Sequence, residues 1–273
     1  MKNLQNLHTH STYCDGKDTP EEMIECALKK GFSAIGFSGH SCMPYSEMPE
    51  IAMSIPETEE YKKEIKVLKK KYAGKIDIFL GLEFDMYSNT ELLGYDYLIG
   101  SLHYLKIDND YAGFDRNAEI VKQIIDKYFK GDGIGFCREY YRQLAELPKY
   151  GKFDILGHID IITKNCEKTS LFDMESKKYL DAAFEAIDSL SGKIPLFEVN
   201  TGAITRGYRT TPYPTKSLLK ELKRKGFGAV ITSDCHDAHY LDCGFEDARK
   251  LLAECGFSEK YILTNNGFVA VEL

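Results

Sequence analysis

Histidine and acidic side chains recur at one kind of position in this sequence, directly after short apolar runs. Six of the seven histidines follow such a run: His8, His10, His40, His103, His158 and His236. Three carboxylates occupy similar positions, namely Asp15, Glu83 and Asp234. Imidazole and carboxylate ligands without an evident thiolate suit zinc, iron or manganese better than calcium or an iron–sulfur cluster. These residues therefore predict a site for divalent transition metals.

Two pairs of these residues have the spacing that a single metal ion needs. His8 and His10 are separated by one residue, as are Asp234 and His236. Because the side-chain period of a strand is two, the members of each pair share one face. One ion takes about four to six ligands, so the whole set calls for two or three divalent ions.

Each candidate ligand also has an ordinary structural interpretation when it is taken alone. An isolated histidine at a strand end is usually hydrogen-bonded within the fold. Glu83 alone is typical of a salt-bridged carboxylate, and Asp15 is typical of a turn because Gly16 follows it. Only the joint pattern favours a metal site.

Apolar runs of strand length alternate with helical patterns along the chain. The first run ends at Leu7, and the others span residues 33–38, 76–82, 97–100, 153–157, 194–199, 229–232 and 261–263. The clearest helix has Thr19 as N-cap, Pro20 at its first position, Glu22 as the capping-box partner and Gly31 after its end. Further helices are predicted over residues 57–72, 117–130, 139–147, 174–190, 215–225 and 245–255.

This alternation predicts a parallel sheet, and seven or eight repeats favour closure into an α/β barrel. An open doubly wound sheet is the alternative. In both folds the carboxyl ends of the strands converge on one edge. We therefore expect the candidate ligands to meet at one mouth.

Length and composition indicate a globular protein with one domain over residues 1–273. The chain has 35 Lys and Arg against 42 Asp and Glu, a net charge of −7, so its surface as a whole repels nucleic acids and anionic membranes. The first ten residues do not resemble a signal peptide, so we expect a cytoplasmic location. The eight cysteines form no C-x-x-C pair and are expected to be free, with Cys14 and Cys235 structural.

Four motifs in order resemble the PHP (polymerase and histidinol phosphatase) family. They are H-x-H with a following acid (His8, His10, Asp15), a lone histidine after the second strand (His40), Gly-His-x-Asp (Gly157, His158, Asp160) and Ser-Asp-x-His (Ser233, Asp234, His236). Glu83 and His103 match the family's intervening ligands. The segments FSGHS, YDYLIGSLHY, GHIDIITK and EVNTGAITRGYRTTPYP resemble the histidinol-phosphate phosphatase branch.

The resemblance implies a distorted (β/α)7 TIM-like barrel with three metal ions at its mouth. It assigns one ion to His8, His10, Glu83 and Asp234, a second to Glu83, His103 and His158, and a third to Asp15, His40 and His236. Glu83 would then bridge two ions. The implied activity is hydrolysis of a small phosphomonoester, L-histidinol phosphate, by a metal-bound hydroxide that attacks phosphorus.

Several further residues are candidates for substrate contacts or catalysis. Arg206 and Arg209, in the loop after the sixth strand, could clamp the phosphate, and Lys164 is a further basic candidate. Glu198 and Asn200 could support a ligand or touch the substrate. The leaving alkoxide needs an acid, for which Asp160, His239 and a metal-bound water are the candidates.

Three alternatives remain open from the sequence. A PHP nuclease or nucleotide phosphoesterase is disfavoured by the acidic balance and by the lack of a basic stripe with interleaved aromatics. An amidohydrolase-like barrel also opens with H-x-H, but it does not need His40 and Asp15. A non-catalytic metal-holding regulatory domain is disfavoured because all nine candidate ligands are present. The oligomeric state is not predicted.

Overall fold

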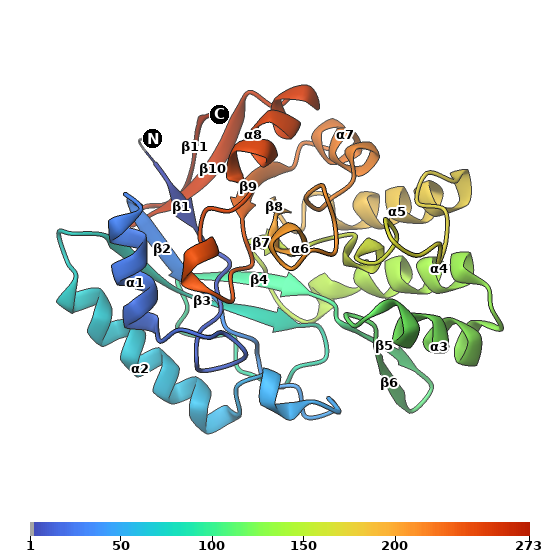
Figure 1. Ribbon diagram of the computed structural model, residues 1–273, viewed down its shortest axis with the longest axis horizontal. Helices are drawn as coiled ribbons and strands as arrows, with labels where there is room; N and C mark the ends of the chain where they lie inside the picture. The colour runs from blue at the N-terminus through green and yellow to red at the C-terminus, as the bar shows by residue number, and fades with distance from the viewer. Residues whose placement is uncertain (1–2) are drawn as a thin grey trace.

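A nearly closed barrel of parallel strands forms the centre of the molecule (Figure 1). The computed structural model describes residues 3–273; residues 1 and 2, at the start of the predicted domain, lie outside them. Within that range the barrel contains, in spatial order, β1 (Gln5–Asn6), β2 (Ala34–Phe37), β3 (Asp77–Asp85), β4 (Tyr97–Ser101), β7 (Ile155–Leu156), β8 (Leu196–Asn200) and β9 (Gly228–Thr232). The predicted barrel is confirmed, and the open sheet is wrong.

The backbone beyond β1 and β9 joins the two edges of the sheet. The N–H of His10 donates to the carbonyl of Cys235 at 2.8 Å, and the N–H of Cys235 donates to the carbonyl of His8 at 3.1 Å. These bonds lie beyond the carboxyl ends of both strands. Closure therefore brings the first and last predicted ligand segments into direct contact.

The helices surround the barrel and begin largely where their capping residues predict. They are α1 (Pro20–Lys29), α2 (Ile55–Lys71), α3 (Ala118–Phe129), α4 (Gly133–Leu144), α5 (Lys177–Leu190), α6 (Gly202–Thr205), α7 (Lys216–Arg224) and α8 (Phe245–Glu254). The capping box predicted at Thr19 is present, since its hydroxyl accepts from the N–H of Glu22 and its own N–H donates to that carboxylate. Helix α4 begins earlier than predicted because Asp132 caps it by accepting from the N–H of Gly135.

Two antiparallel hairpins interrupt the strand–helix alternation. The hairpin of β5 (Tyr104–Ile107) and β6 (Asp110–Gly113) follows β4 and was not predicted. The run at residues 261–263, expected as a barrel strand, instead belongs to the hairpin of β10 (Glu259–Thr264) and β11 (Gly267–Glu272). Its Leu263 exchanges two hydrogen bonds with the Gln5 side chain, at 2.8 and 2.9 Å. The run therefore packs beside β1 without joining the barrel.

The alternation along β3 separates an apolar interior from a polar mouth. Phe79 lies in a buried cluster with Ile99 of β4 and Leu196 of β8. Glu83 and Asp85 lie on the same face of this strand, four and six residues after Phe79, and both are 1% exposed. The barrel interior therefore changes from hydrocarbon to carboxylate at the carboxyl end of the strand.

Candidate metal centre

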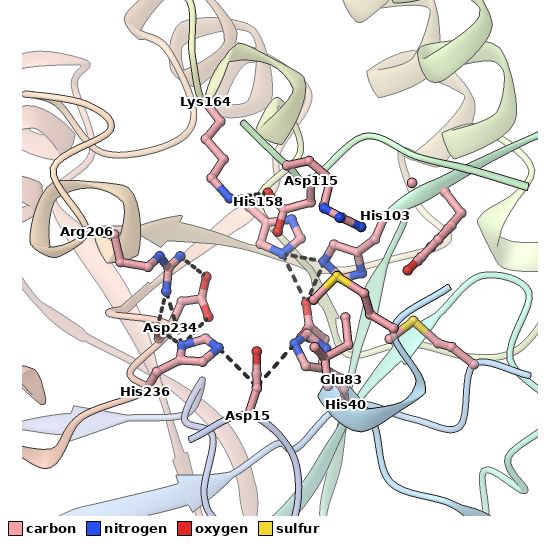
Figure 2. Close-up of a pocket in the computed structure, with 16 residues that line it drawn as sticks. Asp15, His40, Glu83, His103, Asp115, His158, Lys164, Arg206, Asp234 and His236 are labelled. Atoms are coloured by element: carbon pink, nitrogen blue, oxygen red, sulfur yellow. Dashed lines mark hydrogen bonds and ion pairs between the residues drawn. The ribbon is translucent and has the colours of Figure 1, made fainter. Parts of the chain in front are cut away.

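All nine predicted ligands converge at the carboxyl-terminal mouth of the barrel, and Figure 2 shows seven of them around one cavity. Glu83 is contributed by β3, while the other eight residues lie in the loops that follow β1, β2, β4, β7 and β9. Six of the nine are buried, His40 and His236 are partly buried, and Asp15 is exposed. The rule that chemistry collects at strand ends brings these residues together as the sequence predicts.

The carboxylate of Glu83 lies between two groups of imidazoles. Its Oε2 atom lies 2.8 Å from Nδ1 of His40 and 3.3 Å from Nε2 of His8. Its Oε1 atom lies 3.0 Å from Nε2 of His158 and 3.4 Å from Nε2 of His103. Because each oxygen faces a different group, this carboxylate has the geometry needed to bridge two cations.

Two further carboxylates complete the groups on either side of His10. Asp234 Oδ1 lies 3.2 Å from Nε2 of His10, and Asp15 Oδ1 lies 3.2 Å from Nε2 of His236. Asp15 Oδ1 also lies 3.7 Å from Nε2 of His40. His40 therefore faces Asp15 with one ring nitrogen and Glu83 with the other.

Ligand atoms within 4.8 Å of one another form three groups: His10, Asp15, His40 and His236; His8, His10 and Asp234; and His40, Glu83 and His103. These groups overlap the three sets implied by the family resemblance, although His10 and His40 each belong to two groups. One set of side chains thus offers several adjoining positions for a cation.

Buried atoms without a hydrogen-bond partner at the centre of the cluster have the chemistry of cation ligands. His8 Nε2, His10 Nε2 and Glu83 Oε2 are buried and have no hydrogen-bond partner. A buried polar atom without a partner costs free energy, so such atoms need an explanation. Their chemistry, imidazole nitrogen and carboxylate oxygen, is that of ligands for divalent transition metals.

Electrostatics within the cluster favour protons on some imidazoles when no metal is bound. Burial lowers the pKa of His8, but the carboxylates of Glu198, Glu83 and Asp234 together raise it well above its usual value. Burial likewise lowers the pKa of His103, while the carboxylates of Glu83 and Asp85 raise it well above the usual value. These protons partly neutralise carboxylates that would otherwise repel one another.

Metal binding is therefore expected to release at least about one proton per chain near pH 7, because ligating imidazoles must be neutral. The neighbouring carboxylates raise the pKa values of His8 and His103 and so favour the protonated rings in the metal-free protein. Apparent metal affinity should consequently rise with pH, by roughly tenfold per unit for each proton released. Zinc titrations by calorimetry in two buffers of different ionisation enthalpy measure this number, and a heat that does not depend on the buffer would contradict it.

A carboxylate outside the cavity orients two of the imidazole-bearing residues. Glu198 is fully buried; its Oε2 lies 2.8 Å from Nδ1 of His8, and its Oε1 accepts from the N–H of His158 at 2.6 Å. Thr232 and Asn200 each donate one more hydrogen bond to it. Glu198 thus fixes the ring of His8 with Nε2 facing the cluster. Its four contacts support the predicted ligand-supporting role, and the predicted substrate contact is wrong for Glu198 and Asn200, which lie outside the cavity.

Glu198→Gln is expected to lower metal affinity about 10- to 100-fold, the range typical of groups that orient a metal ligand. The amide keeps the shape but loses the negative charge that faces His8. Titration of metal-free protein with zinc measures the affinity, and Glu246→Gln, in an exposed pair with Arg249, serves as the matched control. Equal affinities in the two variants would show that Glu198 only fills space.

The structure also reveals one supporting residue that the sequence analysis missed. Asp85 accepts from the N–H of His103 at 2.9 Å and lies 3.1 Å from its Nδ1, while the Tyr45 hydroxyl donates to its other oxygen. The available signal was its spacing, since Asp85 lies two residues after Glu83 on β3 and so shares its face. Asp85 orients His103 as Glu198 orients His8.

Basic residues line the same cavity beside the ligand cluster. Arg206 Nη2 donates to Asp234 Oδ2 at 2.9 Å, and its Nη1 lies 3.1 Å from Nδ1 of His236. Lys164 Nζ donates to Oδ1 of Asp115 at 2.7 Å. The cavity measures about 280 Å³, and its remaining wall is mostly apolar, formed by Met43, Met48, Ile51 and Tyr104. It can hold a small anion with a partly apolar body.

Two other predicted residues are buried in a separate network. Arg209 is 4% exposed and donates to the hydroxyls of Thr163 and Thr211. Asp160 is fully buried and accepts from the N–H of Thr215 at 2.8 Å. Neither side chain lines the cavity. The predictions of a phosphate clamp for Arg209 and an acid for Asp160 are therefore corrected, because both hold loops together.

His239 lies on the outer surface. Its side chain is 85% exposed, and Nδ1 lies 2.9 Å from the carboxylate of Asp237 in the short turn after β9. The ring is not part of the cavity wall. The prediction of His239 as an acid is corrected as well.

A TIM-like barrel whose mouth brings together six histidines and three carboxylates, with Arg206 and Lys164 beside them, defines a class of barrel proteins suited to bind divalent metal ions. The chain belongs to the PHP domain family, whose match covers residues 6–202. That range includes all candidate ligands except Asp234 and His236, which the geometry adds. The predicted family is thereby confirmed.

Similar proteins cover nearly the whole chain. The histidinol-phosphatase of Bacillus subtilis is 28% identical over 262 residues, covering 88% of this chain and 96% of the relative. A protein of Deinococcus radiodurans named "Probable histidinol-phosphatase" is 29% identical over 270 residues, which cover 94% of this chain and 95% of the relative. The solved histidinol phosphate phosphatase of Lactococcus lactis, complexed with zinc, L-histidinol and phosphate, is 21% identical, with a TM-score of 0.73 and coverage of 97% and 98%.

Proposed function

We propose that this protein hydrolyses a small phosphomonoester, L-histidinol phosphate, to L-histidinol and phosphate, with three divalent ions in the site. The observation that carries the proposal is one cavity lined by seven metal-type ligands together with Arg206 and Lys164, with His8 and His10 grouped behind them, in a chain whose net charge is −7. With the divalent ions bound, such a cavity would attract a phosphate dianion that the rest of the surface repels. The alcohol part of the substrate, L-histidinol, is inferred from the names of the similar proteins.

Zinc, iron or manganese would occupy the positions that the family resemblance assigns. One ion would take His8, His10, Glu83 and Asp234, a second Glu83, His103 and His158, and a third Asp15, His40 and His236. When bound there, divalent ions supply a water of lowered pKa and offset the charge of the phosphate. Glu198 and Asp85 hold the rings of His8 and His103 in position for this task.

Arg206 and Lys164 are proposed to bind the non-bridging oxygens of the phosphate. The planar guanidinium of Arg206 can offer two parallel donors, and the ammonium of Lys164 has donors beyond the one that Asp115 accepts. Both residues are thereby placed to stabilise charge on the phosphate during transfer.

Protonation of the leaving alkoxide is assigned to water. Among the described residues that line the cavity, every histidine belongs to the proposed ligand set. The remaining carboxyl, Asp115, is a poor acid. Burial raises its pKa, but the opposite effect of Lys164, His103 and Arg206 is larger and lowers the pKa to about 2. A group that is ionised at neutral pH has no proton to give.

The proposal places the protein in histidine biosynthesis as one domain over residues 1–273, in the cytoplasm, without a nucleic acid or membrane partner. No helix within residues 3–273 has the length and apolar character needed to cross a bilayer.

The test is kcat/KM of the metal-loaded protein for L-histidinol phosphate beside other small phosphomonoesters, oligonucleotides and amides. We expect L-histidinol phosphate to be preferred and activity to disappear on chelation. Preference for oligonucleotides would favour the nuclease alternative, and preference for amides an amidohydrolase. No turnover with full metal content would favour a metal-holding regulatory domain.

A further inference from the structure

One carboxylate in the cavity has no place among the metal ligands. Of the four carboxylates that line it, Asp15, Glu83 and Asp234 face imidazoles, whereas Asp115 contacts Lys164. Figure 2 shows Asp115 and Lys164 on the side of the cavity next to His103 and His158. The side chain of Asp115 is 34% exposed, so a molecule in the cavity can reach it.

Asp115 is held in place by the segments around it. It lies just after β6, where the N–H of Phe114 donates to the carbonyl of His103 at 3.1 Å. On its other side, the Asn165 side chain donates to the carbonyl of Arg116 at 2.9 Å. The carboxylate is thus fixed relative to a metal ligand instead of moving freely on a surface loop.

A negative charge at this position is unfavourable for a ligand that is only an anion. A phosphate bound at the metal centre would lie in the same small cavity as Asp115, and like charges at short range repel in a partly buried site. A ligand that also carries a positive charge removes this penalty and gains an ion pair. Such an arrangement discriminates between substrates by repulsion as well as by attraction.

The wall formed by Met43, Met48, Ile51 and Tyr104 adds a third requirement. These side chains suit a flat or apolar group and offer few partners to a strongly hydrated one. The cavity therefore combines an anion site, a carboxylate and an apolar surface within about 280 Å³. A phosphorylated amino alcohol with a ring or an apolar side chain matches all three features.

We propose that Asp115 is the specificity residue of this site, and that it selects phosphomonoesters whose alcohol carries an ammonium group close to the ester oxygen. The proposal rests on the proposed function, since the phosphate must bind at the metal centre. Lys164 holds the carboxylate with one N–H and offers another to the phosphate. It thereby connects recognition of the two ends of the substrate.

The kinetic test compares Asp115→Asn with the parent on two substrates, L-histidinol phosphate and 3-(imidazol-4-yl)propyl phosphate, which lacks only the ammonium group. Because the pair is partly exposed, we expect kcat/KM for the amine substrate to fall about 10- to 100-fold. The deamino substrate should change by less than about threefold or improve, since the repulsion is relieved. Asp115→Glu should restore part of the discrimination.

Asp110→Asn, on the exposed β5–β6 hairpin, is the matched control. It should leave the ratio of kcat/KM for the two substrates unchanged. Metal content is measured in every variant. Equal losses of Asp115→Asn on both substrates, with metal content retained, would overturn the proposal and give Asp115 a role at the phosphate. An unchanged ratio with full activity would overturn it as well.

A binding measurement separates this proposal from the proposed function. Calorimetry with L-histidinol and with 3-(imidazol-4-yl)propan-1-ol, in the presence of zinc and inorganic phosphate, needs no turnover. The parent should bind L-histidinol at least about tenfold more tightly than the Asp115→Asn variant does, with no such difference for the deamino alcohol. A parent that binds in this way but does not hydrolyse the phosphate ester would contradict only the proposed function. A parent that hydrolyses the ester without this difference would contradict only the role of Asp115.

Discussion

Glu83→Gln is expected to lower kcat/KM for the phosphomonoester by more than about 100-fold and to reduce the bound metal. Groups that only orient a ligand typically contribute about 10- to 100-fold, and Glu83 lies at the centre of the cluster. One of its oxygens faces His8 and His40, and the other faces His103 and His158. An amide presents an oxygen on one side only and carries no charge, so one of the two groups loses its anionic partner.

His239→Gln is the matched control because its ring is 85% exposed and lies outside the cavity. This variant should stay within about threefold of the parent, as surface substitutions away from the site usually do. Metal analysis and kcat/KM are measured on both variants after purification without chelator. Equal losses with metal retained in both would show that the ligand assignment is wrong.

The clustering of the nine candidate ligands was predictable because two simple regularities determine it. Parallel strands end at one edge of a barrel, and the side-chain period of two predicts that His8 and His10, or Asp234 and His236, share one face. Apolar runs are easy to recognise in a sequence, so the residue after each run is easy to place. The position of Glu83 needed no knowledge of the loops.

Residues in loops were harder to place because a loop can reverse its direction. The segment after β8 folds back on itself, with two hydrogen bonds of 2.9 Å between the backbones of Asn200 and Tyr213. This reversal carries Arg209 away from the mouth and toward Thr163, whereas Arg206 stays beside Asp234. Nothing in the spacing of the two arginines distinguishes these outcomes.

Asp115 was missed for a different reason. It follows the β5–β6 hairpin, an insertion whose strands pair only with each other and in antiparallel fashion. Its place beside Lys164 depends on contacts between segments 49 residues apart. Asp85, in contrast, was within reach of the period-two rule, since it shares a face with Glu83.

Arg206→Ala is expected to lower kcat/KM for the phosphomonoester by at least about 30-fold, because removing one partner of a desolvated charge-assisted contact costs about 2–5 kcal/mol. The guanidinium lies at the cavity wall, where it donates to Asp234 and remains one-third exposed toward a ligand. Arg206→Lys keeps the charge but loses the planar pair of donors, so it should recover only part of the activity.

The contact between Arg206 and Asp234 means that metal content must be measured together with activity. Asp234 also lies 3.2 Å from His10 and 3.7 Å from His8, so we expect the metal to remain in Arg206→Ala and the melting temperature to change little. Arg224→Ala, an exposed arginine paired with Glu221, is the control. Loss of activity with full metal content would support a phosphate contact, and loss of both would assign Arg206 to support of Asp234. Activity within about threefold of the parent would exclude Arg206 as the clamp and leave Lys164 and Arg116, which line the same cavity.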